Sequence, residues 1–143
     1  MPLQPPSDRK LSYFLLRFTL GVSIFIHGVV RLPKIVAFAD GLVKQFADTP
    51  LPAILVRPFA MGLTVEETIT GFLLIIGLWT RWALIIGSLA MAALVFGTSL
   101  RSDWPTVAIQ LSYAAIYAAL LATREYDALS VDRLTHREHQ DVR

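Results

Sequence analysis

The chain has 143 residues, of which 55% are hydrophobic and 17% charged, and its mean hydropathy is +0.56. Soluble domains usually carry about 25% charged residues, so this composition indicates lipid as solvent and excludes an ordinary soluble domain. The net charge is only +2 and the basic residues are scattered, which leaves no footprint for nucleic acid. Cysteine is absent, which excludes a disulfide framework, a thiolate nucleophile and a cysteine-ligated iron–sulfur cluster in this chain.

The first apolar run covers residues 11–30, enough to cross about 30 Å of hydrocarbon as a helix. A cleaved signal peptide is the competing interpretation, because basic residues precede the run and residues 37–39 read Ala-Phe-Ala. The run is too long for a signal peptide, so we expect a membrane helix. Arg17 interrupts this helix, and we expect its long side chain to extend back to the headgroups.

Residues 35–48 follow Pro33 and place apolar residues at helical spacing, with charged residues on the opposite face. This segment is too short and too polar to span, so it predicts an amphipathic helix in the membrane interface. The proline-rich turn at residues 49–52 then starts the second apolar run, residues 53–79.

The third and fourth apolar runs cover residues 82–100 and 105–123. Both carry small residues about one helical turn apart, a spacing that lets helices approach closely in lipid. On the fourth run this stripe consists of Ala108, Ser112, Ala115 and Ala119. Small residues on the third and fourth runs therefore predict helix contacts.

Together the runs predict an all-α fold, an integral membrane four-helix bundle with an interfacial amphipathic helix between helices 1 and 2. We expect an N-terminal segment at residues 1–10, the transmembrane domain at 11–123 and a charged, solvated tail at 124–143. Eight Lys and Arg residues lie on the side of the termini and five on the other, which predicts both termini in the cytoplasm. The expected helix-packing residues are Gly28, Ala60, Gly71, Ser88, Ala92 and Gly97.

Glu67 is the most informative polar residue, because a carboxyl group within the hydrocarbon needs a partner or a proton. Its helical face also carries Ala60, Thr64 and Gly71. Glu66 lies about 100° away with Gly62 and Thr70 as its own small neighbours, so spacing alone does not separate the two glutamates. A structural hydrogen bond between helices and a role in a ligand or proton site are both consistent with this pattern.

His27 lies about one turn before the outer end of the first run, at a height where it can contact Glu67. Such a contact satisfies two buried polar groups, and Arg31 adds positive charge at the same end. A histidine that is merely hydrogen-bonded at the interface is the alternative. No second histidine lies in an apolar run, which argues against a bis-histidine haem.

Gln110, Tyr113 and Tyr117 give the fourth run one polar face. This face offers donors for a quinone carbonyl, and interhelical hydrogen bonding explains it equally well. His136 and His139 stand three apart, which makes a metal site only if other ligands join them, so we expect no metal.

Three groups of strings occur in order along the chain: LLRFTLG with HGVVR, ETITGFLLIIGLWTR, and ALSVDRL. Over residues 11–134 this order resembles the DoxX family of small bacterial membrane proteins, which is related to the DoxD subunit of thiosulfate:quinone oxidoreductases. Arg31 stands where the family usually has lysine. The positions that the resemblance marks are Arg17, His27, Gly28, Arg31, Glu67, Gly71, Arg81 and Asp132.

The resemblance implies a multi-pass protein of the bacterial inner membrane. Together with the lack of a redox group in the chain, it favours an accessory subunit of a larger, quinone-linked redox complex, with catalysis only as part of such an oxidoreductase. We expect membrane lipid and other membrane subunits as partners, no covalent cofactor, and quinone or lipid as ligand. A membrane-protein chaperone or assembly factor, and a small transporter or proton path using Glu67, are the other classes.

Overall fold

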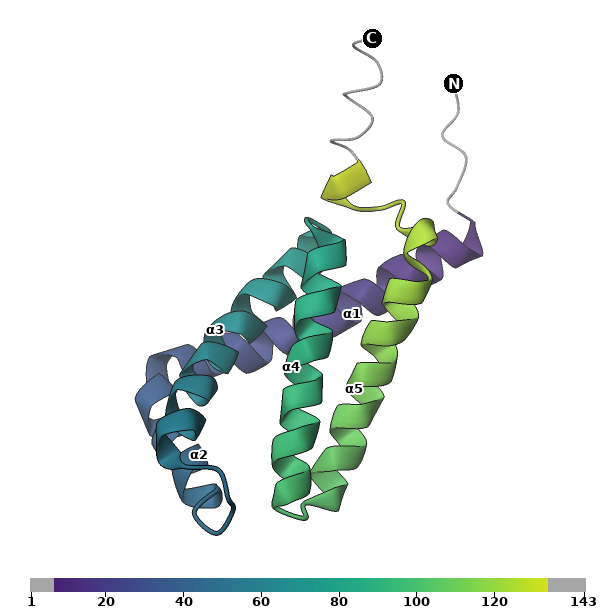
Figure 1. Ribbon diagram of the computed structural model, residues 1–143. Helices are drawn as coiled ribbons and strands as arrows, with labels where there is room; N and C mark the ends of the chain where they lie inside the picture. Colours follow the sequence, from purple (N-terminus) through teal and green to yellow (C-terminus); the bar gives the residue numbers. More distant parts are fainter. Residues whose placement is uncertain (1–6, 134–143) are drawn as a thin grey trace.

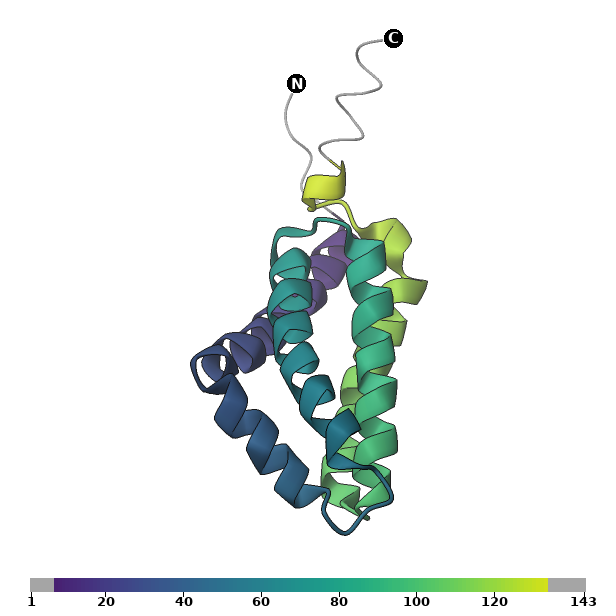
Figure 2. The same cartoon turned by 60° about the vertical axis from the view of Figure 1, so that its left-hand side comes forward.

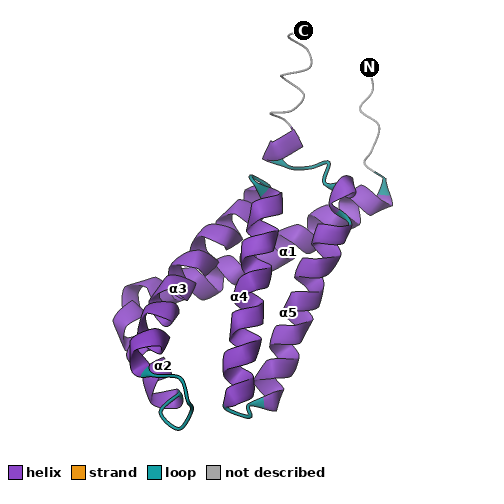
Figure 3. Cartoon of the chain, viewed as in Figure 1, coloured by secondary structure: helices purple, strands orange, loops and turns teal. Residues whose placement is uncertain are grey.

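The computed structural model describes residues 7–133, which form helices and connecting turns without a strand (Figure 3). The elements are α1 (Asp8–Arg31), η1 (Leu32–Lys34), α2 (Ile35–Gln45), α3 (Ala53–Ile76), α4 (Thr80–Leu100), α5 (Trp104–Ala122) and η2 (Arg124–Tyr126). Four helical stretches of the described chain are long and apolar enough to cross a membrane, and the first continues from α1 into α2. The predicted all-helical fold with four membrane-spanning runs is confirmed.

The long helices alternate in direction along the chain (Figures 1 and 2). The start of α1, the α3–α4 connection and residues 124–133 lie at one end, which we call the terminal end. The α2–α3 and α4–α5 connections lie at the other, which we call the far end. Residues 7 and 133, the two ends of the described part, thus lie at the same end of the bundle, and a cytoplasmic location of that end stays a prediction.

Helices α1 and α3 make the most extensive helix–helix contact in the bundle. A Cβ atom added at Gly71 would collide with the backbone of Phe25, and one added at Gly28 would collide with the backbone of Thr68. Ala60 is also fully buried. Because lipid is as apolar as these side chains, close packing of small residues replaces the hydrophobic effect as the force that joins such helices.

A cluster of buried apolar residues joins α1, α3, α4 and α5. Tyr117 of α5 is fully buried and packs against Gly87 of α4, where any side chain would collide with its ring. The other buried residues of this cluster are Tyr13, Leu20, Ile24, Leu74, Ala83, Leu84, Met91 and Leu120. Further buried apolar side chains outside the cluster include Val56, Leu63 and Val107.

The turn between α3 and α4 is tight because Gly77 adopts a left-handed conformation, φ 71°, and ends α3. Its amide donates to the carbonyl of Leu73 at 2.8 Å. Trp79 is also left-handed, φ 48°, and the carboxylate of Asp132 accepts hydrogen bonds from the amides of Trp79 (2.8 Å) and Thr80 (2.9 Å). Asp132 therefore caps the start of α4 from a distant part of the sequence.

Helix α2 follows the turn at Pro33, packs on α3 and ends at Gln45, before the predicted limit of residue 48. An ion pair of 3.2 Å between Arg57 and Asp40 joins the two helices. A helix thus exists where the amphipathic pattern predicted one. Its position in the membrane interface stays a prediction.

Residues 124–133 fold back over the terminal end, and we call them the closing segment (Figure 1). Asp127 and Ser130 are buried there. The expectation that the chain is solvated from Arg124 onward is therefore wrong for these two residues, whereas Arg124, Glu125, Leu129 and Arg133 are exposed. His136 and His139 lie outside the described residues.

The side chain of Arg17 is 0% exposed, so, against expectation, it does not extend to a solvated surface of the bundle. Its guanidinium donates hydrogen bonds to the carbonyl of Leu74 and, at 2.6 Å, to that of Leu129. Its Nε lies 3.6 Å from the carboxylate of Asp127. The closing segment supplies the counter-charge that the sequence analysis did not assign, and this makes burial of the cation tolerable.

Candidate functional site

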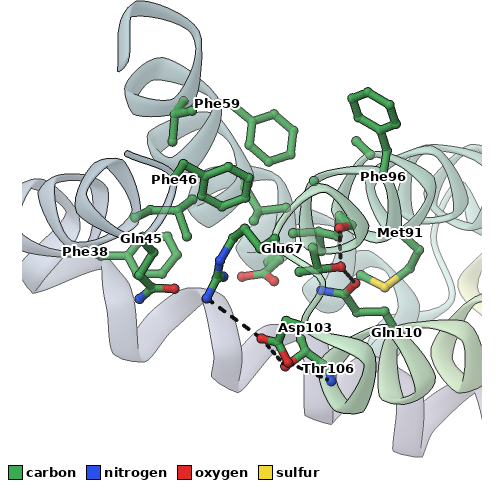
Figure 4. Close-up of a pocket in the computed structure, with 18 of the residues that line it drawn as sticks. Phe38, Gln45, Phe46, Phe59, Glu67, Met91, Phe96, Asp103, Thr106 and Gln110 are labelled. Carbon is green, nitrogen blue, oxygen red and sulfur yellow. Dashed lines mark hydrogen bonds and ion pairs between the residues drawn. The ribbon is translucent and has the colours of Figure 1, made fainter. Parts of the chain in front are cut away.

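A cavity of about 640 Å³ lies in the far half of the bundle, and all five α-helices contribute to its lining (Figure 4). It separates the ends of α1 and α2 and the start of α3 from the end of α4 and the start of α5. Small-molecule sites in proteins commonly have this size.

The cavity walls are mainly apolar and aromatic. Figure 4 shows Phe46 and Gln110 on opposite sides of the Glu67 carboxyl group. The large apolar side chains in the lining are Phe38, Phe46, Phe59, Met91 and Phe96. Such walls suit the body of an apolar ligand, and the few polar groups among them would set its orientation.

The strongest polar feature is an ion pair between α1 and α3. Arg31 Nη1 lies 2.6 Å from Glu67 Oε2, and Glu67 is only 4% exposed. The guanidinium also lies 4.7 Å from the ring centre of Phe38, where it makes a cation–π contact. Both members of the pair line the cavity, so a charged donor and its carboxylate face the ligand space.

His27 lines the same cavity, but the hydrogen bond of Glu67 goes to Arg31 instead. The ring Nδ1 of His27 donates to the carbonyl of Ser23 at 2.7 Å, within its own helix. This bond leaves Nε2 for another partner. His27 is exposed on the described surface, so the bundle itself does not enclose it.

Two of the three polar residues predicted on one face of α5 line the cavity, and the third does not. Gln110 accepts a hydrogen bond of 2.6 Å from Thr98, and the hydroxyl of Tyr113 lies 2.8 Å from that of Ser23. Tyr117 is buried in the core. The hydroxyls of Thr98 and Ser23 were missed because single hydroxyl residues are common in apolar helices and usually bond to their own helix.

Arg101 at the far rim of the cavity was also missed, because the sequence showed it only as one of several basic connection residues. Its guanidinium lies 5.3 Å from the ring centre of Phe46 and 3.8 Å from the Asp103 carboxylate. The side chain of Asp103 caps α5 by accepting from the amide of Thr106 at 3.3 Å. These contacts order the polar rim of the cavity.

The small residues predicted at helix contacts on α4 lie in different surroundings. Gly97 is buried and faces Phe46, whereas Ala92 is exposed. The hydroxyl of Ser88 donates to the carbonyl of Leu84 at 2.7 Å, within α4. The stripe on α5, Ala108, Ser112, Ala115 and Ala119, is exposed along its whole length. The single chain leaves this face of α5 uncovered.

These features define a multi-pass helical membrane protein with a ligand-sized cavity inside its bundle. A comparison with protein-family models matches residues 12–99 to DoxX, from α1 almost to the end of α4. Because this match covers more than half of the sequence, the chain belongs to the DoxX family. No curated protein and no solved structure matches it.

Proposed function

We propose that this DoxX-family protein is an accessory subunit of a larger membrane redox complex and that its cavity holds a quinone. The observation that carries the proposal is the apolar cavity with the Arg31–Glu67 pair in its wall. A quinone combines a ring with two carbonyl acceptors and a long apolar tail, so it needs donors within an apolar space.

The donors available to a quinone come from opposite walls. Arg31 and His27 lie at the end of α1, and Gln110 and Tyr113 lie on α5. A flat ring between these walls would meet a donor at each carbonyl. Phe46 and its aromatic neighbours would pack on the ring faces.

Electron transfer requires a redox group, and this chain has no cysteine to hold an iron–sulfur cluster. A bound quinone also needs a donor or acceptor beside it. The exposed small-residue stripe of α5 supports such an association, because a stripe of this kind lets another membrane helix approach closely. The chain therefore would bind and orient the quinone while a neighbouring subunit exchanges electrons with it.

Purification in mild detergent from native membranes tests both quinone binding and the association with other subunits. The substitution Ala93→Trp places a large side chain in the cavity, because Ala93 lines it, and Ala92→Trp is the matched control at a neighbouring position that is equally exposed but outside the lining. We expect at least about tenfold less co-purified quinone for Ala93→Trp only. Equal quinone content in the two variants, or none in the unchanged protein, contradicts quinone binding.

The partner face is tested separately with Ala115→Phe, which places a ring in the exposed stripe, and with Leu111→Phe as control on the same helix. We expect Ala115→Phe to lose co-purifying polypeptides and to keep its quinone. A chain that purifies alone and reduces quinone with a soluble donor contradicts the accessory role. Partners without quinone would favour the assembly-factor interpretation instead.

A further inference from the structure

A second hollow, of about 830 Å³, lies at the terminal end between the start of α4 and the closing segment. It shares no lining residue with the cavity described above. Three arginines line it, Arg81, Arg124 and Arg133, together with Trp79 and Trp82. Arg81 lies at the start of α4 and the other two lie in the closing segment, so the hollow exists only in the folded chain.

Two of these arginines have guanidinium N–H groups that are not used in hydrogen bonds within the described residues. Arg81 and Arg124 are exposed, and neither guanidinium group makes a hydrogen bond or ion pair within residues 7–133. Arg133 is fixed in place, because its guanidinium donates to the carbonyl of Asp127 at 2.9 Å and to that of Glu125 at 3.2 Å. Guanidinium groups gathered in this way match the oxygens of a phosphate.

Most carboxylates that line the hollow already serve other groups. Asp127 pairs with the buried Arg17, and Asp132 accepts from the amides at the start of α4. Glu125 is exposed at the edge of the closing segment. Hydrogen bonds from neutral amides leave the charge of Asp132 in place, so among the described lining residues three arginines face two carboxylates besides Asp127, namely Glu125 and Asp132, and this balance of one positive charge favours an anion.

Two exposed tryptophans line the hollow. Trp79 and Trp82 are 66% and 61% exposed, and tryptophan is enriched at the headgroup level of membrane proteins, which favours a position of the hollow at that level. Trp79 keeps a left-handed backbone, which costs free energy for a residue with a side chain, and Asp132 holds it there. The apolar residues Leu121 and Ala122 continue the wall toward the lipid.

We propose that this hollow binds the phosphate of an anionic phospholipid, with Arg81 and Arg124 as its main contacts and the tryptophans against the glycerol and upper acyl chain. A free phosphate carries the same charge, but it has no apolar part that could contact the exposed indoles or the apolar wall. Basic hollows at the ends of membrane helices are suited to anionic headgroups.

The chain is well suited to a test by tryptophan fluorescence, because it has three tryptophans and the third, Trp104, lies at the far end. A Trp104→Phe background leaves both remaining indoles at the hollow. This protein is reconstituted into zwitterionic vesicles containing a minor fraction of phosphatidylglycerol. Either the phosphatidylglycerol or an equal fraction of phosphatidylcholine is brominated near the headgroup end of its acyl chains.

We expect the quenching of tryptophan fluorescence to give an apparent affinity for brominated phosphatidylglycerol that is at least about fivefold higher than the affinity for brominated phosphatidylcholine. In Arg81→Gln/Arg124→Gln this preference should disappear, and in Arg81→Lys/Arg124→Lys most of it should persist. The control Lys34→Gln/Lys44→Gln removes the same charge from exposed positions outside the hollow and should keep the preference. The lysine variant also separates loss of charge from loss of fold.

Equal quenching by the two lipids in the Trp104→Phe protein would overturn the proposal. Loss of the preference in both glutamine variants would do the same, because it would reduce the effect to bulk charge. Added inorganic phosphate at millimolar concentration should leave the preference unchanged. If phosphate abolishes it, the hollow binds a free anion and the lipid assignment is wrong.

Discussion

Arg17 in α1 and Asp127 in the closing segment lie 3.6 Å apart, and this ion pair joins the first membrane helix to the chain beyond the last one. The hydrogen bond from Arg17 to the carbonyl of Leu74 adds the end of α3 to the same junction. Three parts of the sequence thus meet at one guanidinium. The terminal end of the bundle is closed by this cation rather than by apolar packing alone.

Replacement of Arg17 by methionine is expected to destabilise the protein by about 3 kcal/mol or more, because it leaves a buried carboxylate without its counter-charge. Thermal unfolding in detergent measures the loss. Lys10→Met removes a charge from the exposed start of the same helix and should change little. The double variant Arg17→Met/Asp127→Asn should recover part of the loss, and no recovery would contradict the pairing.

The stability of the protein should depend on pH through Asp127. Burial raises the pKa of this carboxyl above its ordinary value, and the nearby Arg17 partly opposes the shift. A raised folded-state pKa means that the folded state prefers the protonated acid, so its contribution to the free energy of unfolding falls as pH rises through that pKa. Asp127→Asn should flatten this part of the profile of unfolding temperature against pH. An unchanged profile would exclude Asp127 as its source.

Glu67→Leu is expected to cost more stability than Glu66→Leu. Glu67 bonds across the α1–α3 contact to Arg31, whereas Glu66 accepts a hydrogen bond of 2.8 Å from Thr70 in its own helix. The cost of leaving the partner unpaired is about 1 to 3 kcal/mol. The two variants are compared by unfolding temperature and by retention of partner subunits. Equal losses would mean that the pair carries no more than a local hydrogen bond.

Gly71→Ala should separate or shift α1 and α3, because the added methyl group meets the backbone of Phe25. We expect a loss of about 1 to 3 kcal/mol. Gly62→Ala is the control in the same helix, where nothing lies within 4 Å of the added atom and the better helix propensity of alanine applies. Similar unfolding temperatures for the two variants would contradict the close approach.

The topology is testable because the natural chain has no cysteine to give background labelling. Single cysteines at Ser7 and Lys44 lie at opposite ends of the bundle. In intact cells, an impermeant thiol reagent should label the Lys44→Cys protein and spare the Ser7→Cys protein. Labelling of both from the outside would refute four spans, and the reverse pattern would refute cytoplasmic termini.

The sequence by itself determined the number of helices, their approximate bounds and the family. Membrane-spanning length is a local property, since about 20 consecutive apolar residues satisfy both the hydrocarbon and their own backbone hydrogen bonds. Pro33 and the turn at residues 49–52 marked two boundaries for equally local reasons. Helical spacing put Glu67 on a face with small residues, and the family resemblance favoured it over Glu66; the structure buries Glu67.

Only the tertiary structure decided which polar groups meet. Glu67 pairs with Arg31, and Arg17 pairs with Asp127. Tyr117 lies in the core, whereas Tyr113 lines the cavity. These choices depend on the tilt and rotation of one helix against another, and neither is encoded in the spacing along a single helix. A rotation of one residue, about 100°, directs a side chain to a different neighbour, so partners far apart in sequence are fixed only when the close glycine contacts lock the helices together.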